Sequence, residues 1–233
     1  MTEPKRLALF DLDHTLLPLD SDYQWADYLA RTGRAGNPEE ARRRNEDLME
    51  RYNAGDLTAE QAAEFMLGLL ARANTHDLAH WHEQFMHEVI RPHIRPVALE
   101  LVNQHLQQGD LCAIVTATNQ FVTEPIARAF GIPHLIATVP EYAQGRYTGR
   151  IAGVPSFKEG KVVRVNNWLQ QQGLDLSGFE TSYFYSDSPN DLPLLEVVTH
   201  PIATNPSPAL KEIAQTRGWR ILDIFKDMQD AKS

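Results

Sequence analysis

The spacing of hydrophobic residues changes twice along this chain. Residues 7–10 form a short apolar run that leads into Asp11 and Asp13, a pattern typical of a buried strand with polar side chains at its carboxyl end. From residue 20 to residue 90 the apolar positions recur at helical spacing, without strand-like runs. From residue 97 onward, short apolar runs alternate with helical segments. The pattern predicts a strand, then a group of helices, then an alternating α/β segment.

Four helices are predicted between residues 20 and 90. Residues that commonly cap helices precede them, and a capping-box spacing marks the start of the third. Two prolines within residues 91–96 predict a linker after the fourth. The helices are expected to run from Ser21 or Asp22 to Arg31, from Asn37-Pro38, from Thr58, and from near Thr75 to Val89. Aromatic residues expected in their shared core are Trp25, Tyr28, Phe65, Trp81 and Phe85.

The alternating segment predicts a parallel sheet with helices on both faces. The helical segment breaks this alternation, so we predict an α-helical cap inserted after the first strand. In this division residues 1–16 and 93–233 form the core, and residues 17–92 form the cap. Gln144-Gly145 lies between two strand-like runs and predicts a hairpin. The expected strands are 111–115, 136–142, 146–151, 183–185, 201–203 and 221–222, and the expected core helices are 97–108, 121–130 and 161–172.

Charge and cysteine content narrow the possible functions. The 233 residues carry a net charge of −9, which argues against binding to nucleic acid or to an anionic membrane. The single cysteine, Cys112, lies in an apolar run, so we expect a buried, unreactive thiol and no internal disulfide. No apolar stretch reaches the roughly 18 residues that span a bilayer, and a signal-peptide pattern is missing. We therefore expect a cytoplasmic protein.

Polar clusters follow three of the predicted core strands, at residues 11–15, 116–119 and 186–191. The carboxyl ends of parallel strands meet at one edge of a sheet, so the aspartates of these clusters are expected close together. They are Asp11, Asp13, Asp187 and Asp191. Four ionised carboxylates need a cation, and Mg²⁺ is favoured where a substrate supplies phosphate oxygens. One cluster alone is better explained by turn or helix-cap residues, but three in one fold are not.

Together the clusters resemble the motifs of the haloacid dehalogenase superfamily. Within it, the chain resembles subfamily IB, which includes phosphoserine phosphatase and enzymes that act on histidinol phosphate. The motifs occur in the family's order across nearly the whole chain. The matching residues are Asp11, Asp13 and Thr15 for Asp-x-Asp-x-Thr, Thr116 for the Ser/Thr motif, Lys161 or Lys158 for the lysine motif, and Asp187 and Asp191 for the acidic motif. The resemblance implies a phosphatase with a Rossmann-like core and a helical cap.

The resemblance implies a role for each aspartate. Asp11 is expected to attack phosphorus and form an aspartyl-phosphate, which replaces one difficult hydrolysis by two easier displacements. Asp13 is expected to protonate the leaving alkoxide and then to take a proton from the attacking water. The expected Mg²⁺ ligands are Asp11, Asp187 and the backbone carbonyl oxygen of Asp13. Asp191 is expected to anchor the metal's water shell or the lysine.

Thr116 and a lysine are expected to bind the phosphoryl oxygens, where charge spreads in the transition state. Lys161 is favoured because it begins a predicted helix with an apolar face behind it. Lys158, in the preceding loop, is the alternative. An exposed surface lysine is the competing explanation for either, and for Lys158 it is the favoured one. Further candidate substrate-binding residues are Asp20, Thr118, Asn119 and Asn190.

A cap beside the site excludes bulky substrates, which favours a small phosphorylated metabolite. The resemblance implies that an acidic residue at the position of Asp20 contacts a substrate amine, although capping of the first cap helix explains Asp20 equally well. L-histidinol phosphate and O-phosphoserine both carry an amine. We favour L-histidinol phosphate, because no arginine is identified for the phosphoserine carboxylate and aromatic residues near the cap entrance suit an imidazole.

Other classes of protein compete with this prediction. A phosphotransferase would use the same aspartyl-phosphate but pass the phosphoryl group to a sugar hydroxyl. A dehalogenase has no use for Mg²⁺ or for Asp13 as an acid, and a non-catalytic binding protein would not need every motif position filled. His76 and His80 have metal-ligand spacing, but the His-Glu-x-x-His pattern and a nearby cysteine are missing, which disfavours zinc. Monomer and homodimer are equally compatible with the sequence.

Overall fold

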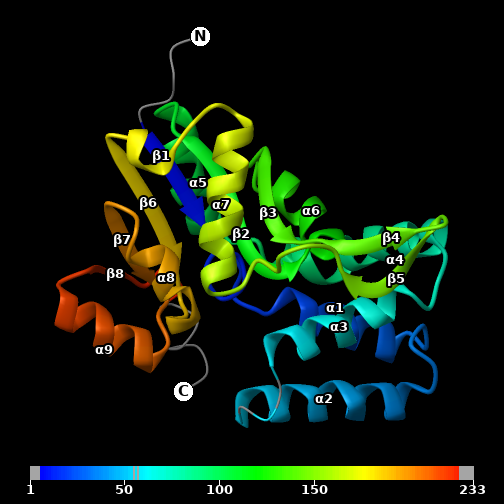
Figure 1. The fold of residues 1–233 in the computed structure, drawn as a ribbon. Coiled ribbons are helices and arrows are strands. Elements are labelled where there is room, and N and C mark those ends of the chain that lie inside the picture. Colours follow the sequence, from blue (N-terminus) through cyan, green and yellow to red (C-terminus); the bar gives the residue numbers. More distant parts are fainter. Residues whose placement is uncertain (1–5, 55, 57, 226–233) are drawn as a thin grey trace.

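The computed structural model describes residues 6–54, 56 and 58–225 of the chain. Its main sheet consists of β1 (Arg6–Phe10), β2 (Leu111–Asn119), β3 (His134–Thr138), β6 (Thr181–Ser186), β7 (His200–Thr204) and β8 (Arg220–Leu222). The strand order is β3-β2-β1-β6-β7-β8, and all neighbours are parallel (Figure 1). The predicted parallel sheet is confirmed, with the first strand in its middle.

Helices cover both faces of this sheet, as predicted. They are α5 (Pro96–Gln107), α6 (Gln120–Ala129), α7 (Glu159–Gln171), the short α8 (Leu192–Leu195) and α9 (Pro208–Arg217). Successive side chains of a strand point to opposite faces, so β1 is apolar on both sides. Leu7 and Leu9 belong to the buried cluster that includes α7, α8 and α9. Ala8 and Phe10 belong to the cluster that includes α5 and α6.

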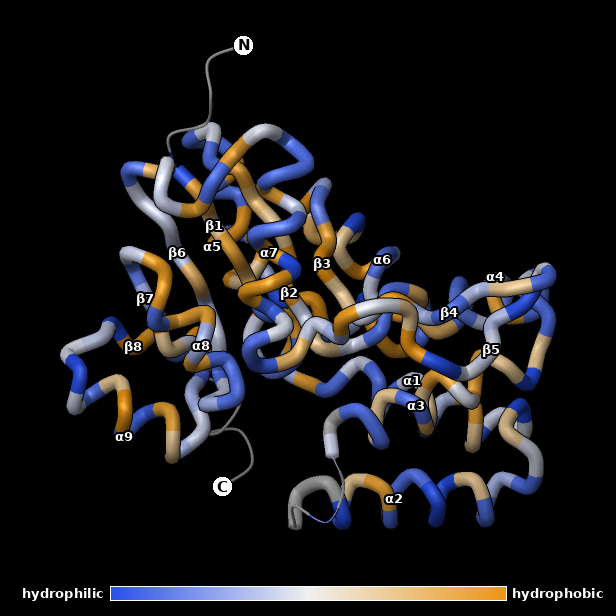
Figure 2. Tube along the Cα trace, in the orientation of Figure 1, coloured by the Kyte–Doolittle hydropathy of each residue, from blue (hydrophilic) through white to orange (hydrophobic). Residues whose placement is uncertain are grey.

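Helices also occupy the chain between β1 and β2. They are α1 (Ser21–Arg31), α2 (Pro38–Ala54), α3 (Ala59–Leu70) and α4 (Thr75–Phe85), followed by a π-helical turn (Met86–Ile90) and a 3₁₀ turn (Arg91–His93). Figure 1 shows α1 and α3 beyond the carboxyl end of β1, and Figure 2 shows the outer helix α2 as largely hydrophilic. Residues 91–96 are predicted to form a linker. In the structure Arg91–His93 form the 3₁₀ turn and Pro96 begins α5. The boundaries of a separate cap, at residues 17 and 92, stay a prediction.

The helical segment has the aromatic core that its sequence predicts. The rings of Trp25, Tyr28 and Phe85 are buried, with centroids 5.2 to 6.0 Å apart. Phe65 and Trp81 are partly buried against the same cluster. Trp25 and Tyr28 stack within α1, and Phe85 of α4 meets Trp25 edge-to-face and Tyr28 in a tilted arrangement, which fixes α1 against α4.

The prediction of one hairpin strand over residues 136–142 was wrong. Its first half is β3 in the main sheet, and its second half is β4 (Pro140–Ala143), which pairs antiparallel with β5 (Arg146–Ile151). The break falls at Val139, between the two strands, and Pro140, which has no N–H group to continue the β3 ladder, begins β4 opposite Ile151. The predicted turn at Gln144-Gly145 is confirmed, with both residues at positive φ. The hairpin lies on α3, where a Cβ on Gly149 would be 3.4 Å from Gly68 Cα.

Two further boundaries differ from the sequence prediction. β2 continues to Asn119 rather than ending at Val115, because after a bulge Asn119 pairs with Thr138 of β3. The second polar cluster therefore lies within the end of the strand. Cys112, on the same strand, is buried as expected.

The first helix is capped by Asp20, which confirms the capping explanation given for that residue, and not by Ser21 or Asp22, where the helix start was also expected. The Asp20 carboxylate accepts a hydrogen bond from the Tyr23 N–H at 2.8 Å. Ser21 and Asp22 lie inside the first turn, and the Ser21 N–H donates to the Asp13 carboxylate. Within the described ranges, no helix combines the length and apolar character needed to cross a membrane.

Candidate active site

The first polar cluster forms a tight loop directly after β1. The Asp11 N–H donates to the Tyr185 carbonyl oxygen at 2.9 Å, which extends the β1–β6 pairing by one residue. The Asn205 side-chain amide, after β7, donates to the carbonyl oxygens of His14 and Thr15 at 3.0 and 3.1 Å. His14 has a φ of 59°, in the left-handed region that tight turns use. These contacts hold Asp11 in a buried position at the carboxyl edge of the sheet.

Lys161 lies between the carboxylates of Asp11, which follows β1, and Asp191, which follows β6. Its Nζ is 2.8 Å from Asp11 Oδ1, and 2.7 and 2.8 Å from the two oxygens of Asp191. The residue is only 2 % exposed. Asp191 also accepts a hydrogen bond from Ser186 Oγ at 2.7 Å. Of the two candidate lysines, the structure brings Lys161, and not Lys158, against Asp11.

Thr15 connects the first and third polar clusters. Its hydroxyl oxygen is 3.2 Å from Asp11 Oδ2 and 3.2 Å from Asp187 Oδ1. A hydroxyl has one proton, so it donates to one of these carboxylates at a time. The Asp11 and Asp187 carboxylates therefore lie on either side of one hydroxyl group, in the arrangement expected from the sheet.

Asp13 faces α1 and the end of β2. One of its carboxylate oxygens accepts a hydrogen bond from the Ser21 N–H at 2.8 Å, and the other accepts one from Thr118 Oγ1 at 2.6 Å. The buried Thr116 hydroxyl, on the same strand, accepts from the Thr118 N–H at 3.2 Å. Asp13 is thus held in one orientation, two residues from Asp11.

The remaining predicted substrate-binding residues take different positions. A cavity of about 800 Å³ opens beside the site, and its walls include Asp20, Thr118, Asn190 and Lys158. This volume is in the range of small-molecule binding sites. Asn119 has another role: it caps α6 and donates to Asp22 Oδ1 at 2.7 Å, which connects α1 to the core.

Burial raises the pKa values of three carboxyl groups of the site. It raises the pKa of Asp187 to about 8, with a further contribution from the charges of Asp11 and Asp191. It raises the pKa of Asp11 to about 7, although the Lys161 ammonium group opposes the change. The pKa of Asp13 rises to about 6 for the same reason, with help from a neighbouring carboxylate. Burial alone would lower the pKa of Lys161, but its two carboxylate partners outweigh burial and raise it.

The donor set fits a hard divalent cation. The four aspartates of the site outnumber the single ammonium group among them. Burial is the largest cause of the raised pKa values of Asp11, Asp13 and Asp187, and the charges of neighbouring carboxylates add to it. Within the described residues, no three His, Cys, Asp or Glu side chains form a metal-ligand group. The predicted ligand set consists of the Asp11 and Asp187 carboxylates and the main-chain carbonyl oxygen of Asp13. It includes only two side chains, so the absence of a group of three does not exclude it. Such oxygen ligands suit Mg²⁺.

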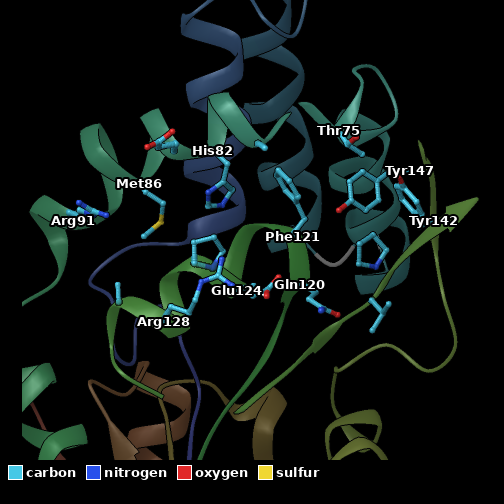
Figure 3. Close-up of a pocket in the computed structure, with 16 residues that line it drawn as sticks. Thr75, His82, Met86, Arg91, Gln120, Phe121, Glu124, Arg128, Tyr142 and Tyr147 are labelled. Carbon is cyan, nitrogen blue, oxygen red and sulfur yellow. Dashed lines mark hydrogen bonds and ion pairs between the residues drawn. The ribbon is translucent and has the colours of Figure 1, made fainter. Parts of the chain in front are cut away.

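A second cavity, of about 900 Å³, lies between α4, α6 and the β4–β5 hairpin (Figure 3). Phe121, Tyr142 and Tyr147 line it. His82 is also in its wall, with Nε2 2.9 Å from the Val122 carbonyl oxygen. No residue of the polar clusters 11–15, 116–119 and 186–191 lines this cavity, whereas Thr118 and Asn190 line the first one, so we assign the second cavity no part in the chemistry.

Sequence reasoning missed three groups that support the site. Asn205 follows the predicted strand 201–203 and could have been found by the same strand-then-polar signal as the other clusters. Ser186 is the first residue of the third polar cluster, but its bond to Asp191 depends on the turn between them. Asp22 contacts Asn119 across 97 positions of the sequence, and no local pattern marks such a pair.

Comparison with known proteins identifies the family. A family model described as haloacid dehalogenase-like hydrolase matches residues 8–196. The chain is 42 % identical over 221 residues to the histidinol-phosphatase of Neisseria meningitidis serogroup C, covering 94 % of this chain and 99 % of that protein. It is 31 % identical over 177 residues to a phosphoserine phosphatase of Mycobacterium tuberculosis, covering 76 % of this chain and 56 % of that protein.

Solved structures agree with this result. A Bordetella pertussis Tohama I protein of unknown function has 72 % sequence identity and a TM-score of 0.94, covering 95 % of this chain and all of that one. A substrate-bound phosphoserine phosphatase has 19 % identity and a TM-score of 0.65, covering 98 % and 99 %, a likeness of fold alone. This chain belongs to the haloacid dehalogenase-like hydrolase family. The predictions of this family and of a phosphatase are confirmed.

Proposed function

We propose that this chain is a Mg²⁺-dependent phosphomonoesterase of amino-acid biosynthesis that acts on L-histidinol phosphate in the cytoplasm. The reaction rests on one observation above the others: the buried Asp11 carboxylate lies 2.8 Å from the Lys161 ammonium group, which Asp191 holds in place. The substrate rests on the 42 % identity to a histidinol-phosphatase, which extends over nearly the full length of both chains.

Asp11 is the proposed nucleophile. One of its carboxylate oxygens bonds to phosphorus while the bond from phosphorus to the ester oxygen breaks. The leaving alkoxide oxygen takes a proton from Asp13 and departs as the alcohol. Asp13 then accepts a proton from a water molecule that attacks the phosphoryl group. Inorganic phosphate leaves, and Asp11 is regenerated as a carboxylate. Burial sets the pKa of Asp13 at about 6, which lets it both donate and accept a proton near neutral pH.

The surrounding groups stabilise charge and fix geometry. Lys161 stabilises the phosphoryl oxygens, and Thr116 is the proposed hydroxyl donor to them. Thr118 and the Ser21 N–H hold Asp13 toward the leaving group. Bound Mg²⁺, held by Asp11, Asp187 and the carbonyl oxygen of Asp13, would neutralise the charge of the phosphoryl group.

Substrate choice is proposed to depend on the acidic wall of the 800 Å³ cavity. Asp20 and Asp22 both line it, and burial raises the pKa of each carboxyl group. A substrate ammonium group would offset this negative charge. O-phosphoserine is the second candidate, because a phosphoserine phosphatase is 31 % identical over 76 % of this chain. Both candidates are small phosphorylated amines.

The direct test measures phosphate release from L-histidinol phosphate, O-phosphoserine and an aryl phosphate with Mg²⁺ present. We expect all three to be hydrolysed, with the highest kcat/KM for L-histidinol phosphate. An Asp11→Asn preparation, purified in the same way, serves as the blank for contaminating phosphatases. A higher kcat/KM for O-phosphoserine would replace the proposed substrate. Transfer of the phosphoryl group to an added sugar, seen in the products, would make the chain a phosphotransferase.

A further inference from the structure

Lys158 has a strained backbone beside the active-site cavity. Its φ of 49° and ψ of −123° lie in a region that residues with a Cβ rarely adopt. Such a conformation costs free energy and persists where the surrounding structure enforces it, most often at functional sites. Glycine would adopt it without strain. The presence of lysine instead of glycine at this position therefore suggests that the lysine side chain has a role.

The start of α7 enforces this conformation. The Gly160 N–H donates to the Phe157 carbonyl oxygen at 2.9 Å, and the Lys161 N–H donates to the Lys158 carbonyl oxygen at 3.0 Å. Pro155 O lies so close that a Cβ on Gly160 would be 2.1 Å from it. The loop is thus fixed tightly against the helix that carries Lys161. The same helix start sends Lys161 to Asp11 and places Lys158 in the cavity wall.

The charges of the cavity show what the Lys158 side chain can bind. Among the described residues that line the cavity, Asp20, Asp22 and Glu60 are acidic and Lys158 is the one basic residue. No carboxylate of the described chain forms an ion pair with its Nζ, which lies 5.3 Å from the centre of the Phe157 ring. The ammonium group is therefore available to an anion in the cavity.

Lys161 cannot supply this charge alone. Its ammonium group already contacts Asp11 and both oxygens of Asp191, so these three side chains together carry a net negative charge. An approaching phosphate dianion meets further carboxylates in the cavity wall. A second cation on the approach to Asp11 would attract the dianion and orient it.

We infer that Lys158 binds the phosphoryl oxygens of the incoming substrate, as a second phosphate-binding lysine beside Lys161. The inference rests on the proposed phosphatase reaction but not on the identity of its substrate. It also explains the strained backbone, because glycine at this position would have no ammonium group. Lys158 and Lys161 are then not alternatives: one captures the phosphate and the other stabilises it during transfer.

The test compares Lys158→Ala, Lys158→Gly and Lys158→Arg with the wild type, using an aryl phosphate as substrate and inorganic phosphate as competitive inhibitor. Removing the ammonium group is expected to raise KM and the phosphate Ki about 10-fold or more, with kcat within about 3-fold. The arginine variant should recover most of the affinity. Lys211→Ala, on the exposed face of α9, makes the same change in net charge and should leave both constants unchanged.

Thermal unfolding separates binding from strain. Lys158→Gly relieves the positive φ and should have a higher Tm than Lys158→Ala, while both lose the same phosphate affinity. An unchanged KM and Ki in the alanine and glycine variants would overturn the inference, whatever their Tm. Equal Tm values for the two would refute the strain argument. Because the wild type must hydrolyse the aryl phosphate for these constants to exist, a protein that releases no phosphate would instead overturn the proposed function.

Discussion

Replacing Lys161 with methionine removes the ammonium group that lies between Asp11 and Asp191 and keeps most of the side-chain volume. Both carboxylates are buried, and Lys161 contacts them at 2.7 to 2.8 Å. Breaking a buried ion pair from one side leaves an uncompensated charge, which costs about 3–5 kcal/mol of stability. Here two carboxylates lose one partner, so we expect a loss at the upper end of that range. Asp11 can reduce the cost by taking up a proton, because burial raises its pKa.

Urea unfolding in the presence of a chelator measures this loss, because a bound cation would otherwise replace the missing charge. Lys211→Met, a matched change on an exposed helix, should alter the free energy of unfolding by less than about 0.5 kcal/mol. Adding Asp191→Asn to Lys161→Met should recover part of the loss, because it removes one unpaired charge. A loss below about 1 kcal/mol for Lys161→Met would show that the buried ion pair does not exist as described.

Three more predictions follow from the site and its surroundings. A chelator should abolish phosphate release, and Mg²⁺ should restore it far better than Ca²⁺, which prefers longer bonds and more ligands; full activity with the chelator would exclude a metal. Asp20→Asn, which keeps a helix-capping side chain, should cost about 1.5–3 kcal/mol in kcat/KM for amine-bearing substrates and little for an aryl phosphate, and equal losses would rule out amine recognition. His82 is buried and its pKa falls from 6.5 to about 4, so the unfolded chain binds its proton first as the pH drops. The stability of the wild type relative to His82→Gln should therefore be constant above pH 6.5 and decrease by up to about 3 kcal/mol towards pH 4, whereas a flat difference would mean that His82 is not buried in its neutral form.

The parallel sheet and the grouping of its polar clusters followed from the sequence, because both depend on local patterns. Apolar runs mark strands, and parallel strands must bring their carboxyl ends to one edge. The sequence pattern alone predicts that Asp11, Asp187 and Asp191 lie close together. The contacts of Thr15 with Asp11 and Asp187, and of Lys161 with Asp11 and Asp191, agree with that prediction. The residue roles derived from the motifs stay predictions until they are tested.

Features that depend on distant partners could not be predicted. The sequence of residues 136–142 predicts one strand. In the structure its first half pairs with β2 and its second half pairs with β5. Three adjacent polar residues could each cap α1. In the structure Asp20 accepts from the Tyr23 N–H, while the Ser21 N–H donates to Asp13, which lies outside the helix. Lys158 and Lys161 both lie near the start of one predicted helix. Their different positions, with Lys161 against Asp11 and Lys158 in the cavity wall, depend on the direction of α7 in the fold.

The central claim is that Asp11 is the nucleophile, and the kcat of Asp11→Asn tests it most directly. The amide has the same shape and can still accept a hydrogen bond from Lys161, so the protein should fold, which its thermal unfolding checks. It cannot form the phosphoenzyme at a useful rate. With saturating aryl phosphate and Mg²⁺, we predict a kcat at least about 10³-fold below that of the wild type, a barrier higher by about 4 kcal/mol. A folded Asp11→Asn protein with a kcat within about 10-fold of the wild type would contradict the account and assign the nucleophile to another residue.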